Sequence, residues 1–80
     1  MAKVDEVFDS ITNWMNWEGF YKPNVPTTKE MSFSDFDMDE IDFIELITWL
    51  EKEYKIAFEE PDVEQTITIG EMCKIVELLS

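Results

Sequence analysis

The sequence lacks histidine and contains a single cysteine, Cys73. Without histidine the chain has neither the commonest general base nor the commonest metal ligand, and it cannot form Ser-His or Cys-His nucleophile pairs. One cysteine cannot build a zinc site without histidine partners, and it cannot form an internal disulfide. Nothing in this composition demands an oxidising compartment, so we expect a cytoplasmic protein.

Glycine and basic residues are also scarce. Gly19 and Gly70 are the only glycines, which excludes a glycine-rich phosphate loop. Six basic residues stand against 19 acidic ones, giving a formal net charge of −13. Such a surface repels nucleic acids and anionic lipid heads, and its natural partners are basic protein surfaces. The same charge favours a soluble monomer.

Long hydrophobic runs are absent. No stretch approaches the roughly 18 apolar residues that a membrane-spanning helix requires. Residues 1–7 mix charged and apolar side chains, which argues against a signal peptide.

The abundant carboxylates suggest a calcium loop, because Asp35, Asp37 and Asp39 place acids at alternate positions. The sixth position of such a loop requires glycine and is Glu40, and the twelfth requires glutamate and is Leu46. We therefore expect no dedicated metal site. A chain of 80 residues also has little room for a deep pocket, so we expect no enzymatic activity.

With 45% hydrophobic residues, the chain is too apolar for an intrinsically disordered segment, and we expect one domain spanning residues 1–80. Its first part has apolar residues at spacings of three and four, which predicts an amphipathic helix that ends near Gly19. The predicted inner face comprises Val4, Val7, Phe8, Ile11, Trp14 and Met15. Trp14 and Trp17 together suggest an aromatic binding box, but at this spacing Trp14 is interpreted as a core residue.

Residues 20–36 read as a long connection, because Pro23 and Pro26 interrupt any helix. A loop of this length is uncommon in a small domain unless its own apolar side chains attach it to the core. The side chains expected to do so are Phe20, Tyr21, Val25, Met31, Phe33 and Phe36.

A second helix is predicted from about Met38 to Tyr54, with Asp37 as its N-cap and Glu40 at the capping-box position. Its apolar stripe is wider than one core contact needs. Part of the stripe is therefore either exposed as a docking surface or packed on a second side. The stripe comprises Ile41, Phe43, Ile44, Leu46, Ile47, Trp49, Leu50 and Tyr54.

A helical turn is expected near residues 61–65, and a last helix after Thr68, an N-cap with Glu71 at the capping-box position. Its expected inner face comprises Ile69, Met72, Cys73, Val76 and Leu79, which makes Cys73 a small buried hydrophobe. The predicted fold is all-α, an irregular antiparallel four-helix bundle of three longer helices and one short one.

Residues 35–42 resemble the signature of acyl carrier proteins, in which an aspartate, a serine and a leucine open the second helix. Ile41 stands at the position of the leucine, and Asp39 and Asp42 stand at those of the flanking aspartates. Residues 43–54 are similar to the second helix of that family, and residues 68–76 to its last helix.

In that family the serine hydroxyl is joined to 4′-phosphopantetheine, whose thiol holds the cargo. Glu40 stands at this position, and a carboxylate cannot make the stable phosphodiester, so we expect no cofactor. Three interpretations of Glu40 remain open. It is an acid favoured by the helix dipole, a substitute for the negative charge of the phosphate, or an engineered replacement of serine.

The resemblance implies that the chain is a carrier-like interaction module that docks through its second helix onto basic patches, including those of carrier-processing enzymes. Ile41, Ile44 and Thr48 would supply the apolar contact, and the acidic residues would steer the partner. The expected docking residues are Glu40, Ile41, Asp42, Ile44, Glu45, Thr48 and Glu51.

Two alternatives stay open. One is a true acyl or peptidyl carrier in fatty-acid, polyketide or nonribosomal peptide biosynthesis, with a substituted serine; only this alternative requires 4′-phosphopantetheine. The other is a small acidic inhibitor or immunity-type protein that blocks a basic active site.

Overall fold

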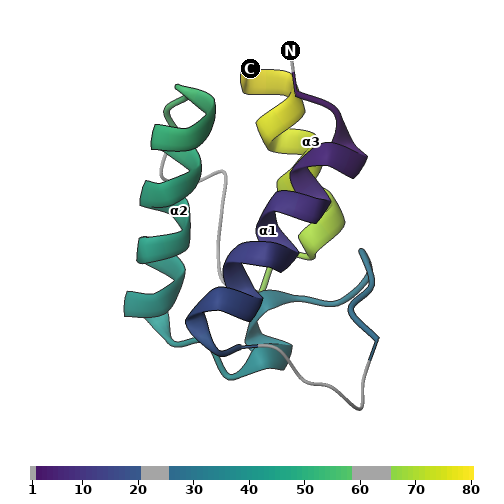
Figure 1. Cartoon of the computed structure of the whole chain (residues 1–80), viewed down its shortest axis with the longest axis vertical. Helices are drawn as coiled ribbons and strands as arrows, with labels where there is room; N and C mark the ends of the chain where they lie inside the picture. Colours follow the sequence, from purple (N-terminus) through teal and green to yellow (C-terminus); the bar gives the residue numbers. More distant parts are fainter. Residues whose placement is uncertain (1, 21–25, 59–65) are drawn as a thin grey trace.

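A computed structural model of the chain describes residues 2–20, 26–58 and 66–80. This part of the chain contains α1 (Val4–Glu18), a 3-10 helix η1 (Phe33–Phe36), α2 (Glu40–Tyr54) and α3 (Ile69–Leu79). Figure 1 shows α1 packed against α3, with α2 on the other side of the bundle. The direction of α1 is opposite to that of α2 and α3, and both termini lie at one end. The all-α prediction is confirmed, while the helical turn expected near residues 61–65 lies outside the described residues.

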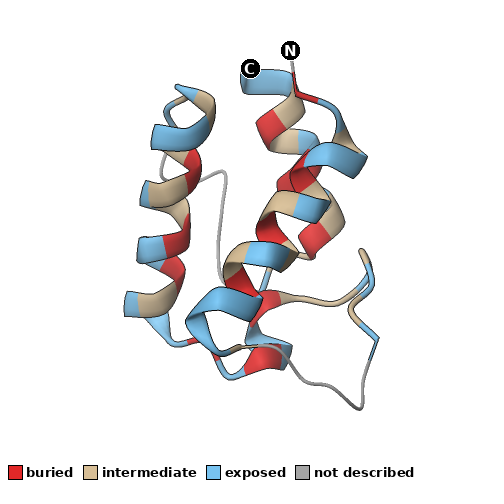
Figure 2. Ribbon diagram, viewed as in Figure 1, coloured by how far each residue is buried: buried red, intermediate tan, exposed pale blue. Residues whose placement is uncertain are grey.

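The core lies between the inner faces of the three helices, which are the buried faces coloured red in Figure 2. In α1, Val7, Ile11 and Met15 are buried, and Val4, Phe8 and Trp14 pack against them half-buried. Gly19 closes α1 in the left-handed conformation, with a φ of 90° that glycine adopts without steric cost. The prediction for the first helix is therefore confirmed in its face and in its end.

The long connection is attached to the core by its aromatic side chains, as expected. Phe33 and Phe36 are buried, and Phe20 and Met31 pack partly buried against the core. The ring of Phe33 lies 5.6 Å from that of Phe43 in α2, measured between centroids. The two phenylalanines belong to η1, a short helix that the sequence patterns did not predict. Tyr21 and Val25 lie outside the described residues.

The same connection also caps α3 through backbone hydrogen bonds. The amide of Ile69 donates to the carbonyl of Met31, and the amide of Gly70 donates to that of Lys29, each at 2.8 Å. Two first-turn donors that a helix cannot satisfy internally are thereby paired. A Cβ at residue 70 would lie 3.0 Å from the Lys29 carbonyl oxygen, so any other residue here would push the Lys29 backbone away by a few tenths of an ångström.

The N-cap of α2 is Asp39, and the prediction of Asp37 with Glu40 is wrong. The Asp39 carboxylate accepts from the amide of Asp42 at 2.8 Å, and the Asp42 carboxylate accepts from the amide of Asp39 at 3.2 Å. Asp37 closes η1 in the left-handed conformation, with a φ of 59°, whereas an N-cap needs extended backbone. The helix therefore begins at Glu40, and Met38, expected in its first turn, is a buried residue before it.

The last helix has the predicted cap, since the Thr68 hydroxyl accepts from the amide of Glu71 at 3.1 Å. Ile69, Met72, Cys73 and Val76 are buried as expected. Leu79 is not, because 42% of its surface is exposed. It is the last residue of α3, and α3 ends at the end of the bundle where both termini lie (Figure 1).

Candidate functional site

The outer face of α2 carries two large hydrophobic side chains in contact with solvent. Ile41 is 68% exposed and Ile44 is 55% exposed, whereas Phe43, Leu46 and Leu50 on the opposite side are buried. Ile47, Trp49 and Tyr54 are half-buried and flank the core contact. The wide apolar stripe was expected to be either partly exposed or packed on a second side. For Ile41 and Ile44 the structure shows exposure.

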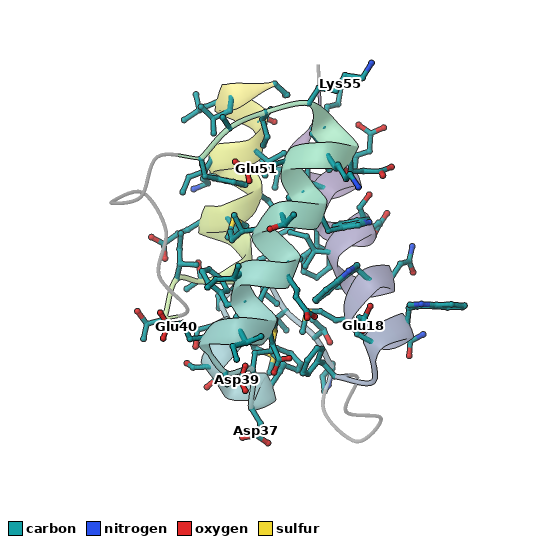
Figure 3. All side chains as sticks on the ribbon, turned by 90° about the vertical axis from the view of Figure 1, so that its left-hand side faces the viewer. Glu18, Asp37, Asp39, Glu40, Glu51 and Lys55 are labelled. Carbon is teal, nitrogen blue, oxygen red and sulfur yellow. The ribbon has the colours of Figure 1, made fainter. Side chains whose placement is uncertain are left out.

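The predicted docking residues divide into an exposed set and a pair with internal partners. Glu40, Ile44 and Thr48 follow one another at intervals of four along α2, and Ile41 and Glu45 form the neighbouring row. All five are exposed. Figure 3 views α2 from this side, with Glu40 at its start and Glu51 nearer its end.

Asp42 and Glu51 are half-buried, and their carboxylates accept hydrogen bonds from backbone amides of the same chain. Asp42 takes part in the reciprocal cap with Asp39, and Glu51 accepts from the amide of Phe58 at 3.0 Å. The second bond fixes the chain that leaves α2. These two carboxylates still contribute negative charge, but they are not free to reorient toward a partner.

The Thr48 hydroxyl donates to the carbonyl of Ile44 at 2.9 Å. Its polar hydrogen is therefore used inside the helix, and the side chain adds mainly its methyl group to the surface beside Ile44. The exposed row is thus apolar in its middle.

Charge is distributed unevenly along α2. Asp37, Asp39 and Glu40 gather at the start of the helix, and Lys55 lies just beyond its end (Figure 3). The exposed Lys52 precedes it in the last turn. The start of α2 is therefore its more acidic end, whereas Lys52 and Lys55 offset Glu51 and Glu53 at the other end, so a basic partner is attracted mainly toward the start of the helix.

The start of α2 offers no hydroxyl group. The first turn consists of Glu40, Ile41, Asp42 and Phe43. The nearest serine in sequence is Ser34 in η1, whose hydroxyl is hydrogen-bonded to that of Ser32 at 2.8 Å. The exposed side chain at the first position of α2 therefore offers a carboxylate, that of Glu40, and no hydroxyl group.

The single thiol belongs to the core. Cys73 is fully buried, and burial raises the pKa of its thiol from 9.0 to about 11, against a smaller lowering by the nearby Lys29 ammonium. Because the thiolate is the reactive form, Cys73 is a packing residue, as predicted.

Among residues 2–20, 26–58 and 66–80, no three acidic or thiol side chains converge closely enough to hold a metal ion. No helix in this same part of the chain has the length and apolar character needed to cross a bilayer.

Known proteins resemble this chain along most of its length. A family model described as a phosphopantetheine attachment site matches residues 19–76. The acyl carrier protein of Brachyspira hyodysenteriae is 33% identical over 78 residues, which cover 96% of this chain and 95% of that protein. The acyl carrier protein of Lactobacillus johnsonii is 31% identical over 74 residues, or 91% of each chain.

The chloroplastic acyl carrier protein 4 of Arabidopsis thaliana is 35% identical over 54 residues, covering 68% of this chain and 39% of that protein. The resemblance in residues 35–42 is thus matched by similarity well outside that segment. The family match, the two similar proteins of nearly equal length and the all-α fold agree. The chain belongs to the acyl carrier protein family with its phosphopantetheine attachment-site domain, a family of carriers and not of enzymes.

Proposed function

We propose that this member of the family carries no 4′-phosphopantetheine at residue 40 and acts as an acidic interaction module that docks through α2. The observation that carries the proposal is Glu40, an exposed carboxylate at the first position of α2. A stable phosphodiester needs a hydroxyl oxygen, whereas a carboxylate oxygen joined to phosphate would give a reactive mixed anhydride. The residues at the helix start therefore do not fit the arm.

Glu40 can substitute for the charge of the arm without its chemistry. The N-terminus of a helix favours negative charge, and Glu40 is at the first position of α2. In relatives that bear an arm, its phosphate would lie at this helix end. A partner whose basic residues recognise that phosphate would meet the Glu40 carboxylate instead.

The docking contact is apolar in its centre and charged at its edges. Ile41 and Ile44 supply the apolar centre, with 68% and 55% of their surfaces available to a partner. Glu40 and Glu45 flank them and attract basic residues on approach. Asp42 and Glu51 support this face by holding the two ends of α2. The partners are basic-patched proteins of the kind that process carriers.

The remaining parts of the proposal rest on composition. The domain comprises residues 1–80, works in the cytoplasm and is monomeric, since copies with a charge of −13 repel one another.

The absence of the arm is tested by intact mass. The protein is incubated with a promiscuous phosphopantetheinyl transferase and coenzyme A, and we expect no mass gain. Glu40→Ser should gain the mass of one arm, because the surrounding surface belongs to the carrier family. A mass gain by the unaltered protein would contradict the proposal.

The docking role is tested by affinity for the same transferase, measured with the protein immobilised. Ile44→Ala and Glu45→Lys are each expected to weaken binding about threefold to tenfold, as removal of a central contact typically does. Leu78→Ala is the matched control, because Leu78 is 82% exposed on α3 and lies outside this face. Equal affinities of the unaltered protein and both α2 variants would remove α2 from the mechanism.

A second candidate function is a true carrier, and the description of the matched family as an attachment site favours it. This function would require the arm to be attached to another hydroxyl, of which Ser34, exposed in η1, is nearest in sequence. A mass gain that Ser34→Ala abolishes would establish it. No observation favours the inhibitor alternative.

A further inference from the structure

The start of α2 presents one carboxylate that the helix cap does not use. The carboxylates of Asp39 and Asp42 accept from each other's backbone amides, so both are held within the cap. Glu40 stands between them in the sequence, takes no part in that cap and is exposed. Figure 3 shows it at the beginning of the helix. Its charge is therefore available to a partner that approaches α2.

A glutamate side chain is similar in length to a phosphorylated serine. Its carboxyl carbon is as many bonds from Cα as the phosphorus of a serine phosphodiester, and each of these groups carries a single negative charge. In a loaded carrier, that phosphorus would belong to the arm. Glu40 therefore holds, without any loading step, a charge that a serine at this position acquires only when the arm is attached.

An exposed apolar pair adjoins this charge. Ile44 follows Glu40 by four residues and lies beside it on the helix surface, and Ile41 follows Glu40 directly. The two isoleucines are 55% and 68% exposed. One turn of a helix advances about 5.4 Å, so a partner that covers this pair also reaches Glu40. The contact partly desolvates the carboxylate, which strengthens its pairing with a cation on the partner.

We propose that Glu40 occupies the phosphate subsite of enzymes that act on loaded carriers, so that this chain competes with loaded carriers for these enzymes. An enzyme of this kind meets a phosphodiester at the start of the carrier's helix, and cationic groups stabilise such an anion. The same groups would pair with the Glu40 carboxylate. The inference rests on the proposed function, and it adds that the chain inhibits a reaction that it cannot undergo.

A second copy of the chain is a poor occupant of this surface. Two copies would bring together two formal charges of −13, which repel one another. A cationic enzyme site has the complementary charge. The occupant is therefore a different protein.

The test uses a phosphodiesterase that removes the arm from a purified, loaded acyl carrier protein, because this enzyme must bind the phosphate whose ester it cleaves. Release of 4′-phosphopantetheine is measured at several concentrations of the loaded carrier, with and without the unaltered chain. We expect competitive inhibition. Glu40→Gln should raise the inhibition constant about fivefold to tenfold, as the loss of a charge-assisted hydrogen bond does.

Glu18→Gln is the matched control, because it removes the same charge from an exposed glutamate at the end of α1. It should change the inhibition constant by less than about twofold, since only long-range attraction is reduced. Circular dichroism should show the same fold for both variants. Equal inhibition constants of the unaltered chain and Glu40→Gln would overturn the proposal. So would an equal loss in the two variants, inhibition that excess loaded carrier does not relieve, or self-association that depends on Glu40 in sedimentation equilibrium.

A chain that does not inhibit the phosphodiesterase also overturns this inference. The docking function is then judged separately by the affinity for the transferase. It stands if Ile44→Ala still weakens that binding, and it fails if Ile44→Ala and Glu45→Lys both leave the affinity unchanged.

Discussion

The Cys73 side chain lies on the inner face of α3, where solvent does not reach it. Desolvation disfavours the thiolate and raises the pKa of this thiol to about 11 in the folded protein, from an ordinary value of 9.0. The thiol is thus protonated when folded over a range of pH in which it would ionise if unfolded. This difference links the stability of the protein to alkaline pH.

Between pH 9 and about 11 the unfolded chain loses the Cys73 proton while the folded chain keeps it. The unfolded state then binds fewer protons, so the free energy of unfolding falls as the pH rises through this interval. We predict that Cys73→Ala loses less stability across the interval than the unaltered protein does. Urea denaturation at a series of pH values measures both. Parallel pH dependences would show that the thiol does not ionise on unfolding.

At the scale of single residues, the sequence correctly predicted the burial of side chains that the neighbouring helices cover completely. The helical spacing that placed Cys73 and Val76 in the core did so correctly. The same spacing failed for Leu79, because periodicity gives the face of a helix and not the point at which the opposite helix stops covering it. Trp14 was correctly read as part of the core, half-buried at its edge, whereas Trp17, the other indole of the suggested aromatic box, is 88% exposed.

At the scale of elements, the start of α2 shows two overlapping capping patterns. Asp37 with Glu40 and Asp39 with Asp42 each place an acid three residues after an aspartate. The choice between them depends on η1, since Asp37 closes that turn in a left-handed conformation. The short helix in turn depends on Phe33 and Phe36 reaching the core, which is a tertiary contact that local propensity does not reveal.

The cap can be tested with two replacements of Asp39. Asp39→Ala removes the acceptor for the amide of Asp42 and is expected to lower the free energy of unfolding by about 1 kcal/mol. Asp39→Asn keeps a side-chain acceptor and is expected to lose only a fraction of that amount. Urea denaturation distinguishes them. If alanine and asparagine cost the same, the carboxylate acts through its charge and not as a cap.

The spacing of apolar residues predicted the second helix but not which of its faces is exposed. The seven docking residues were predicted from the family resemblance, and five of them are exposed. The apolar stripe of α2 extends around much of the helix, and only packing decides which residues are covered. Phe43, Leu46 and Leu50 are buried by the bundle, which leaves Ile41 and Ile44 outside. The internal hydrogen bonds of Asp42 and Glu51 could not be read from charge alone, because their partners are backbone amides positioned by the fold.

At the scale of the whole molecule, the acidic charge is confined to a small volume. The radius of gyration of the Cα atoms is 11.5 Å, close to the screening length of about 10 Å at moderate salt. The 19 acidic residues outnumber the six basic ones, so the charges of the molecule repel one another on balance when salt is low. Unfolding separates the charges, so this repulsion opposes the compact state.

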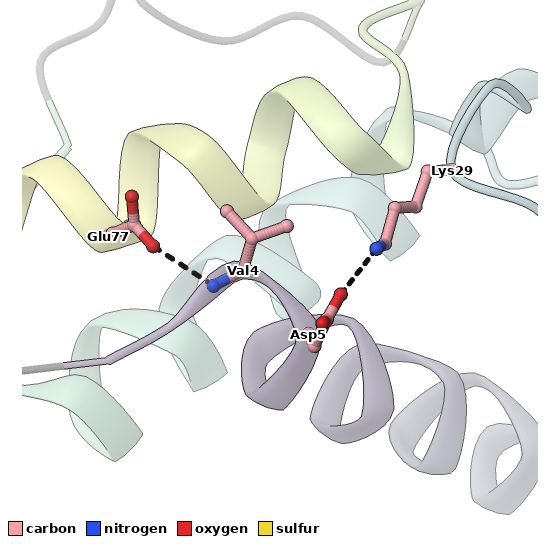
Figure 4. Close-up of polar contacts among 4 residues, drawn as sticks. All are labelled: Val4, Asp5, Lys29 and Glu77. Carbon is pink, nitrogen blue, oxygen red and sulfur yellow. Dashed lines mark hydrogen bonds and ion pairs between the residues drawn. The ribbon is translucent and has the colours of Figure 1, made fainter.

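Added salt should consequently stabilise the fold. We predict that the temperature of unfolding rises when sodium chloride is increased from about 10 mM to about 300 mM, because screening weakens the repulsion. Salt also weakens the ion pair of Lys29 with Asp5 (Figure 4), which acts in the opposite direction, but this is one exposed pair against a net charge of −13. The repulsion should therefore dominate.

Glu45→Lys is the matched variant, because it changes one exposed charge from −1 to +1 and the net charge from −13 to −11. It should have the higher unfolding temperature at low salt and the smaller rise with salt. Binding to a basic partner should follow the reverse trend and weaken as salt is added, since the same screening removes the attraction. An unfolding temperature that falls with salt in both proteins would mean that specific ion pairs outweigh the net charge.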